Sequence, residues 1–300
     1  MRKRKQLLAV VLCLSVFFVT AQGCGSSDPD DGKDIVSSEN KGDSVTTDES
    51  GKVTVTIEEQ VLFEQDGIVV TAKEYVTDRI WGDGIKLLIE NNSDKNVTVG
   101  CNALIVNNYM ISDLFVSGVA AGKKANEVMY LSNTELEAAG IENVGQIEAY
   151  FHVYDTDTYE TLFDTDCVTI QTSGFAGMDM VADDSGEELY NENGIRIIGK
   201  TVDENSFWGT AILLYCENNS GKNISISVNE MSINGFMMDP LFTTTIYDGK
   251  KAYEDITIFS EDLAANGIEA IDEVELRFHI YDAGSYETIA DSDVVKFSAQ

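Results

Sequence analysis

Residues 151–155 read Phe-His-Val-Tyr-Asp, and residues 278–282 read Phe-His-Ile-Tyr-Asp. In both stretches, apolar residues that favour burial alternate with polar or amphipathic ones, which is the period of a strand with one buried face. The stretches lie 127 residues apart, and laying residues 64–170 over 191–297 needs no gap and gives 39 identities in 107 positions. Such agreement indicates an internal duplication, so the chain carries two copies of one strand-rich unit.

Other segments of both copies predict strands as well. The same two-residue period runs through Ile85, Leu87 and Ile89, and through Ile212, Leu214 and Cys216. Asp66-Gly67 and Asn193-Gly194 separate apolar runs, and such pairs are typical of tight hairpin turns.

One short helix is expected in each copy, over residues 134–139 and 261–265. In the first copy, Ser132 and Glu135 fit a capping box and Gly140 supplies the stop. With seven to nine short strands per copy, the pattern predicts an all-β chain of two tandem immunoglobulin-like β-sandwich domains, each with one short helix.

The first residues have the features of a secretory signal. Four basic residues, Arg2 to Lys5, precede an apolar run from Leu7 to Ala21, which is too short to span a bilayer as a helix. The run ends in Ala21-Gln22-Gly23-Cys24, which resembles the lipobox of bacterial lipoproteins, although that family prefers leucine where Ala21 stands. The resemblance implies removal of residues 1–23, lipidation of Cys24 and anchoring at the outer face of the cell membrane. The alternative is an ordinary signal peptide cut nearby, with Cys24 as an odd thiol.

Three motifs carry a second resemblance: the turn Glu90 to Lys95, the turn Gly122-Lys123-Lys124 and the strand 151–155, each with a second-copy partner. Together they resemble a repeated domain of uncharacterised secreted lipoproteins of Gram-positive bacteria. The resemblance covers both copies and implies fold and location, and that family supplies no activity to carry over. The expected organisation is a signal peptide (1–23), a lipidated Cys24 with a disordered acidic tether (24–52), a first repeat (53–173), a linker (174–184) and a second repeat (185–300).

The charge balance is strongly acidic, with 52 Asp and Glu against 20 Lys and Arg and a net charge of −32. Loss of the four basic signal residues would leave −36, and each predicted domain contributes −14. Such a surface argues against nucleic-acid binding, which needs basic patches. It would attract cations or basic partners, or it is simply a solvated exterior.

The residues with the clearest chemical potential are the two histidines and the two tryptophans. His152 and His279 are equivalent positions, and we expect them either to bind a ligand or to be ordinary outward-facing strand residues. Trp81 and Trp208 each precede a glycine, and they either stack on a sugar or protein partner or close one end of the core. No nucleophile elbow or other enzyme motif is found, so the sequence predicts a non-enzymatic protein.

Two further groups of side chains have both a functional and a structural interpretation. Acidic turn residues could supply oxygen ligands to calcium, or could be clustered only because the chain is acidic: Asp155, Asp164, Asp166, Asp282, Asp291 and Asp293. Cys101, Cys167 and Cys216 align with Val or Ile in the other copy, which favours small buried hydrophobes, although a Cys101–Cys167 disulfide remains open.

The leading hypothesis is a lipid-anchored surface protein whose two domains bind an unknown protein or glycan ligand without catalysis. The alternative is a cation-binding or structural protein of the cell envelope.

Overall fold

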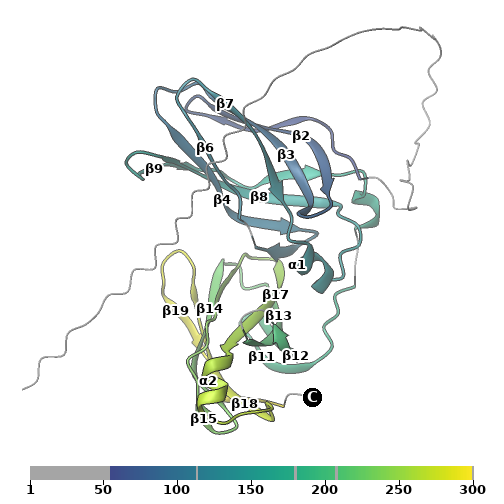
Figure 1. Ribbon diagram of the computed structural model, residues 1–300, viewed down its shortest axis with the longest axis vertical. Coiled ribbons are helices and arrows are strands. Elements are labelled where there is room, and N and C mark those ends of the chain that lie inside the picture. Colours follow the sequence, from purple (N-terminus) through teal and green to yellow (C-terminus); the bar gives the residue numbers. More distant parts are fainter. Residues whose placement is uncertain (1–54, 113, 179–180, 207–208, 299–300) are drawn as a thin grey trace, which may run out of the picture. The chain divides into compact units, whose positions relative to one another are not determined.

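The computed structural model describes residues 55–112, 114–178, 181–206 and 209–298 (Figure 1). Strands dominate these ranges and are accompanied by two short α-helices, so the all-β prediction is confirmed. The predicted signal peptide, Cys24 and the acidic tether lie outside the described residues, as does Trp208. Neither α-helix of the described ranges has the length and apolar character needed to cross a membrane.

The elements of the first copy occupy residues 60–177. They are β1 (Gln60–Gln65), β2 (Ile68–Asp78), β3 (Gly82–Asn91), β4 (Val97–Val106), β5 (Tyr109–Ile111), β6 (Val116–Val119), β7 (Lys124–Tyr130), α1 (Asn133–Ala138), β8 (Gln146–Asp155), β9 (Thr161–Asp164), β10 (Val168–Gln171) and the 3-10 turn η1 (Phe175–Gly177).

The elements of the second copy follow in the same order about 127 residues further along the chain. They are β11 (Glu187–Glu192), β12 (Ile195–Ser206), β13 (Gly209–Asn218), β14 (Ile224–Ile233), β15 (Phe236–Met237), β16 (Thr243–Ile246), β17 (Lys250–Phe259), α2 (Ser260–Ala265), β18 (Glu273–Asp282), β19 (Thr288–Asp291) and β20 (Val295–Ser298).

The described strands form several sheets. One has the order β1-β2-β3-β7. A second has the order β10-β8-β4-β5-β17-β13-β12-β11, with β6 beside β4 and β9 beside β8. A third has the order β15-β14-β18-β19, with β16 beside β14 and β20 beside β18. All neighbours are antiparallel except β5 and β17, which pair in parallel at Tyr109 and Lys251.

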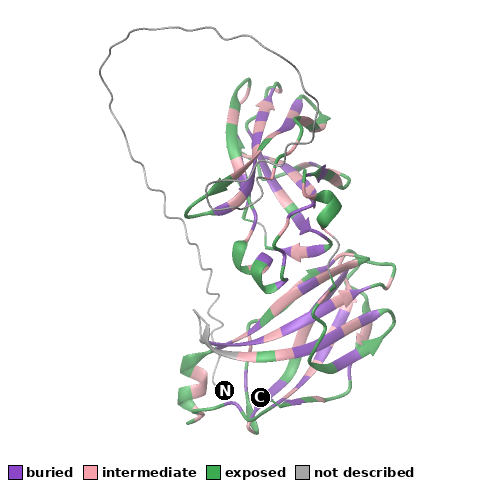
Figure 2. Ribbon diagram, turned by 90° about the vertical axis from the view of Figure 1, so that its right-hand side faces the viewer, coloured by how far each residue is buried: buried purple, intermediate pink, exposed green. Residues whose placement is uncertain are grey.

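Two apolar cores lie between the layers of strands, and strand β8 shows how the sequence builds them. Phe151 and Val153 are fully buried, whereas His152 and Tyr154 on the other face are half-buried. Buried and more exposed residues alternate in this way along the strands of Figure 2. Burial of one large apolar side chain contributes about 1.5–3 kcal/mol, so this alternation fixes which face of β8 points inward.

The predicted hairpin turns are confirmed by their backbone angles. Asp66 and Gly67 both have positive φ, at 51° and 82°, and Asn193 and Gly194 repeat this at 55° and 77°. A two-residue turn with positive φ at both positions matches the twist of the strands that it connects.

In each copy, a buried asparagine amide connects a turn to the end of a neighbouring strand. Asn91 Nδ2 donates to the carbonyls of Lys95 (2.8 Å) and Val119 (2.9 Å), and Asn91 Oδ1 accepts from the Ser93 amide and hydroxyl. Asn218 makes the same four contacts in the second copy. Every donor and acceptor site of the amide is therefore used, so its burial leaves no polar atom without a hydrogen bond.

The helices lie where the sequence predicted them, but the predicted capping box is wrong. Ser132 makes no side-chain cap bond to α1. The Glu135 carboxylate instead accepts hydrogen bonds from the amide and hydroxyl of Ser112, both at 2.6 Å. Glu135 thus bonds to Ser112, which is distant in the sequence, and not to the start of its own helix. Gly140 ends the helix with a φ of 67°, as expected for a residue in the left-handed region.

Candidate functional site

A row of aromatic side chains lies on the outward face of strand β8. His152 and Tyr154 point away from the core because their neighbours Phe151 and Val153 are buried. The His152 and Tyr154 rings are 5.5 Å apart between centroids and tilted by 35°. Tyr159, from the turn after β8, continues the row at 6.3 Å from Tyr154 with a tilt of 21°.

The second copy repeats this row on strand β18. The rings of His279 and Tyr281 are 5.3 Å apart, and those of Tyr281 and Tyr286 are 6.3 Å apart. We call His152, Tyr154, Tyr159 and Asp164 the first tyrosine strip. Their counterparts His279, Tyr281, Tyr286 and Asp291 form the second tyrosine strip. All four residue types are identical between the copies.

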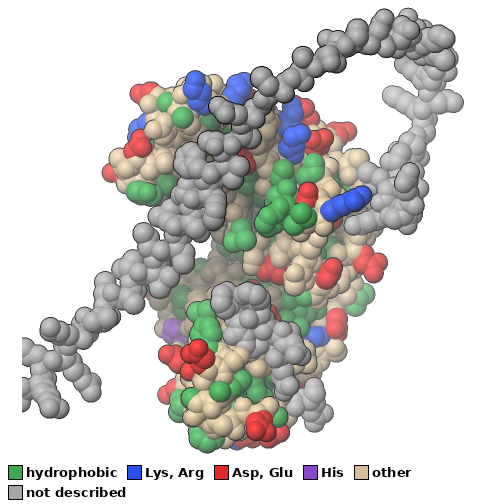
Figure 3. Space-filling model, viewed as in Figure 1, with side chains coloured by type: hydrophobic (Ala, Val, Ile, Leu, Met, Phe, Trp, Pro, Cys, Tyr) green, Lys and Arg blue, Asp and Glu red, His purple; other side chains and the backbone are tan. Residues whose placement is uncertain are grey.

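Each histidine is held by an aspartate from the neighbouring strand. His152 Nδ1 lies 2.5 Å from Asp164 Oδ1, and His279 Nδ1 lies 2.6 Å from Asp291 Oδ1. A carboxylate only accepts hydrogen bonds, so Nδ1 carries the proton in these contacts, which do not use Nε2. Figure 3, in which histidine is purple, shows a histidine side chain at the molecular surface.

The most exposed tyrosine of each strip has an unusual backbone conformation. Tyr159 and Tyr286 both have a φ of 61° and are 79% and 76% exposed. Turn hydrogen bonds hold them there, since their amides donate to the carbonyls of Asp155 (2.8 Å) and Asp282 (2.9 Å). A bulky residue in this region costs of order 1–3 kcal/mol, and such strain is concentrated at functional sites. Solvent exposure means that packing does not explain the choice of tyrosine.

The sheet beside the first strip carries two glycines, with Thr98 between Tyr154 and Gly118. Gly100 pairs with His152, and Gly118 lies one strand further out, beside Thr98. A Cβ atom at Gly118 would meet nothing within 4 Å, so packing does not require glycine there. Glycine inside a strand often marks close approach of a ligand or another backbone.

The corresponding surface of the second strip carries hydroxyl groups instead. Ser227 pairs with His279, and Thr245 stands where the first copy has Gly118. The two strips therefore have the same aromatic residues, but the residues of the sheet beside them differ.

The structure does not bring the predicted calcium ligands together. The Asp155 carboxylate accepts hydrogen bonds from the amides of Asp157 and Thr158 and pairs with Lys95 at 3.3 Å. Burial raises its pKa, but these contacts outweigh that effect and leave the pKa below its ordinary value.

Asp282 has the same role in the second copy. The amides of Ser285 and Gly284 and the ammonium of Lys222 lower its pKa to about 2. The remaining acids divide between two settings: Asp164 and Asp291 bond to histidine, and Asp166 and Asp293 are exposed. Among the described residues, no group of three or more His, Cys, Asp and Glu side chains is arranged to hold a metal.

Trp81 does not close the end of the core. Its side chain is 66% exposed and lies 6.1 Å from the Tyr130 ring. The Asp78 carboxylate holds the loop by accepting from the amides of Ile80 and Trp81, and these contacts lower the pKa of Asp78. Trp81 precedes β3 beside α1, at the opposite end of the strands from the first tyrosine strip.

The three cysteines of the described residues do not share one environment. Burial is confirmed for Cys216, where it raises the thiol pKa, but Cys167 is exposed because it precedes the first ladder residue of β10. Cys101 is half-buried on β4, with β8 between it and Cys167. No disulfide joins any of these three.

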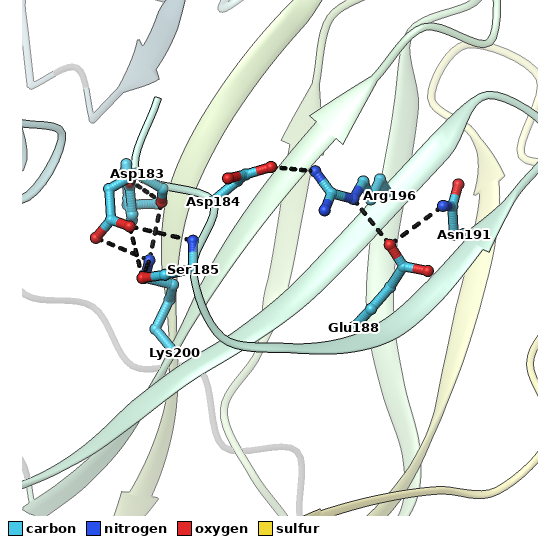
Figure 4. Close-up of polar contacts among 8 residues, drawn as sticks. Asp183, Asp184, Ser185, Glu188, Asn191, Arg196 and Lys200 are labelled. Carbon is cyan, nitrogen blue, oxygen red and sulfur yellow. Dashed lines mark hydrogen bonds and ion pairs between the residues drawn. The ribbon is translucent and has the colours of Figure 1, made fainter. Parts of the chain in front are cut away.

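A second polar cluster, drawn in Figure 4, fastens the end of the predicted linker to strand β12. Arg196 bonds to Asp184 at 2.7 Å and to Glu188 at 3.0 Å, and Lys200 Nζ bonds to the carbonyl oxygen of Asp183 at 2.8 Å. The hydroxyl of Ser185 and the ammonium of Lys200 lower the pKa of Asp183 to about 2. The charges of this cluster are satisfied within the chain, so we assign it a structural role.

No protein-family model matches the sequence, and no curated protein matches it. Among solved structures, the chain is similar to the Salmonella enterica SafA pilin in complex with the SafB chaperone, with 8% identity and a TM-score of 0.20 over 72% of this chain and 88% of that one. It is also similar to a protein of unknown function from Porphyromonas gingivalis W83, with 11% identity and a TM-score of 0.21 over 72% of this chain and 89% of that one. Likenesses this distant carry no argument about function.

Proposed function

We propose that the chain is a lipid-anchored surface protein in which two tandem immunoglobulin-like domains act as non-enzymatic binding modules. Each module presents its tyrosine strip to a protein or glycan ligand. The tether of residues 24–52 holds the modules away from the membrane to which Cys24 is attached.

The observation that carries this proposal is the duplicated, exposed tyrosine strip. Across the two copies, 39 of 107 aligned positions are identical, and the four strip residues are among them. On the same strand, the buried Val153 is replaced by Ile280, whereas the buried Phe151 is kept as Phe278. Retention of the exposed Tyr159 and Asp164, and of the half-buried His152 and Tyr154 on the outward face, favours a role outside packing.

The chemistry of the strips suits recognition. Tyrosine offers a large rigid surface with two side-chain torsions, so little conformational entropy is lost when a ligand covers it. The paired His152 and Asp164 add a fixed hydrogen-bonding group at one end of the row. Two linked modules would raise the avidity for a ligand with repeated sites.

The test compares binding by the full chain and by a strip variant on glycan and peptide arrays. The strip variant carries Tyr159→Gly and Tyr286→Gly, since glycine accepts the positive φ of these positions. The matched control carries Phe236→Ala, which removes an aromatic ring that is 46% exposed and lies outside both strips. We expect array signals that the strip variant loses and the control keeps. Equal signals from all three proteins would contradict the proposal.

A further inference from the structure

The spacing of the rings indicates the shape of ligand that the strips could accept. Tyr154 and Tyr159 are 6.3 Å apart, as are Tyr281 and Tyr286. In an extended peptide, side chains two residues apart are separated by about 6–7 Å. An extended segment laid along a strip would therefore place alternate side chains over successive rings.

The charge around the strips indicates the kind of side chain. Asp157, Glu160 and Asp166 are exposed carboxylates on the β8–β9 hairpin and the segment that follows it. The nearby cation Lys95 is already engaged with Asp155. The first strip is thus an aromatic surface bordered by uncompensated negative charge.

The second strip is also bordered by uncompensated negative charge. Glu287 and Asp293 are exposed, and Lys222 pairs with Asp282. Aromatic ring faces attract ammonium and guanidinium groups, and adjacent carboxylates strengthen that preference.

We infer that both tyrosine strips bind alternate Lys or Arg side chains of an extended basic peptide segment, an inference that rests on the proposed binding function. The open space at Gly118, beyond Thr98, leaves room for the peptide backbone near the first strip. Ser227 and Thr245 would instead offer hydroxyl partners beside the second.

The test measures binding of fluorescent peptides to the full chain by anisotropy. The probes are (Arg-Thr)6, the neutral (Gln-Thr)6 and the acidic (Glu-Thr)6, each at low and at moderate salt. We expect only (Arg-Thr)6 to bind. The strip variant with Tyr159→Gly and Tyr286→Gly should lose about 2- to 5-fold in affinity for each ring that the peptide covers. The Phe236→Ala control should bind like the unaltered protein.

The design separates aromatic recognition from simple attraction to an acidic protein, because Tyr→Gly and Phe→Ala leave the charge unchanged. If (Arg-Thr)6 binding is abolished by salt and is equal in all three proteins, the strips are not its site and the inference is overturned. If the strips bind (Gln-Thr)6 or an array glycan and not (Arg-Thr)6, the binding function stands and the basic ligand is wrong. If no probe binds, the inference is also overturned.

Discussion

The positive φ of Tyr159 predicts an inverted order of stability for two small substitutions. Tyr159→Ala and Tyr159→Gly both delete the ring and its contact with Tyr154, so that loss cancels in a comparison between them. Alanine retains the left-handed penalty of about 1–2 kcal/mol, which glycine avoids. Glycine loses about 0.5–1 kcal/mol through its greater freedom in the unfolded chain. We therefore expect the glycine variant to be more stable by roughly 0.5–1 kcal/mol.

The assay is urea unfolding of the full chain followed by tryptophan fluorescence, with thermal unfolding as a second measurement. A difference of 1 kcal/mol corresponds to about 2–4 °C in midpoint for a chain of this size. Tyr154 is the control, because it is not among the described residues with positive φ. There the ordinary order should return, with alanine more stable than glycine. An alanine variant at position 159 as stable as the glycine variant would show that the turn is unstrained.

Two other predictions concern burial and anchoring. Glu254 lies half-buried on β17, where burial raises its pKa to about 7 despite a hydrogen bond from Thr244. The free energy of unfolding should therefore fall as pH rises from about 4.5 towards 7. The substitution Glu254→Gln should restore of order 1–3 kcal/mol of this free energy at pH 8 and nothing at pH 4.5. Equal pH profiles for the two proteins would refute this prediction. Metabolic labelling with palmitate in a Gram-positive host should mark the full chain but not Cys24→Ser, and equal labelling of both would rule out Cys24 as the lipidated residue.

The sequence predicted the parts of the fold that depend on local physics. Alternation placed Phe151 inside and His152 outside, and the Asp66-Gly67 pair defined a tight turn. It did not predict the contact between His152 and Asp164, because that contact depends on the register between β8 and β9. The pairing of β8 with β9 shifts its register between Val153 and Tyr154, and no residue of the turn predicts such a shift.

His152 and Asp164 of the first strip were among the candidate residues, but the tyrosines were missed for a related reason. Nothing in a single turn suggests that Tyr159 would occupy a position normally filled by glycine. One available signal was the identity of Tyr159-Glu160-Thr161 and Tyr286-Glu287-Thr288 between the copies. The calcium hypothesis did not consider that backbone amides compete for the same carboxylate. An aspartate at the start of a turn readily accepts hydrogen bonds from the amides of that turn, as Asp155 does.

The buried amides of Asn91 and Asn218 also bear on how the duplicated copies could diverge. Each amide bonds to one carbonyl in the turn after its own strand and to another at the end of β6 or β16, so a residue inserted in that turn would pull a partner away. A buried donor left without a partner costs about 1–3 kcal/mol. The length of this turn is therefore constrained, and so is most of its sequence, since only Asp94 differs between residues 91–96 and 218–223. The absence of a gap at this turn can thus persist long after other residues have changed, so it gives little information on the age of the duplication.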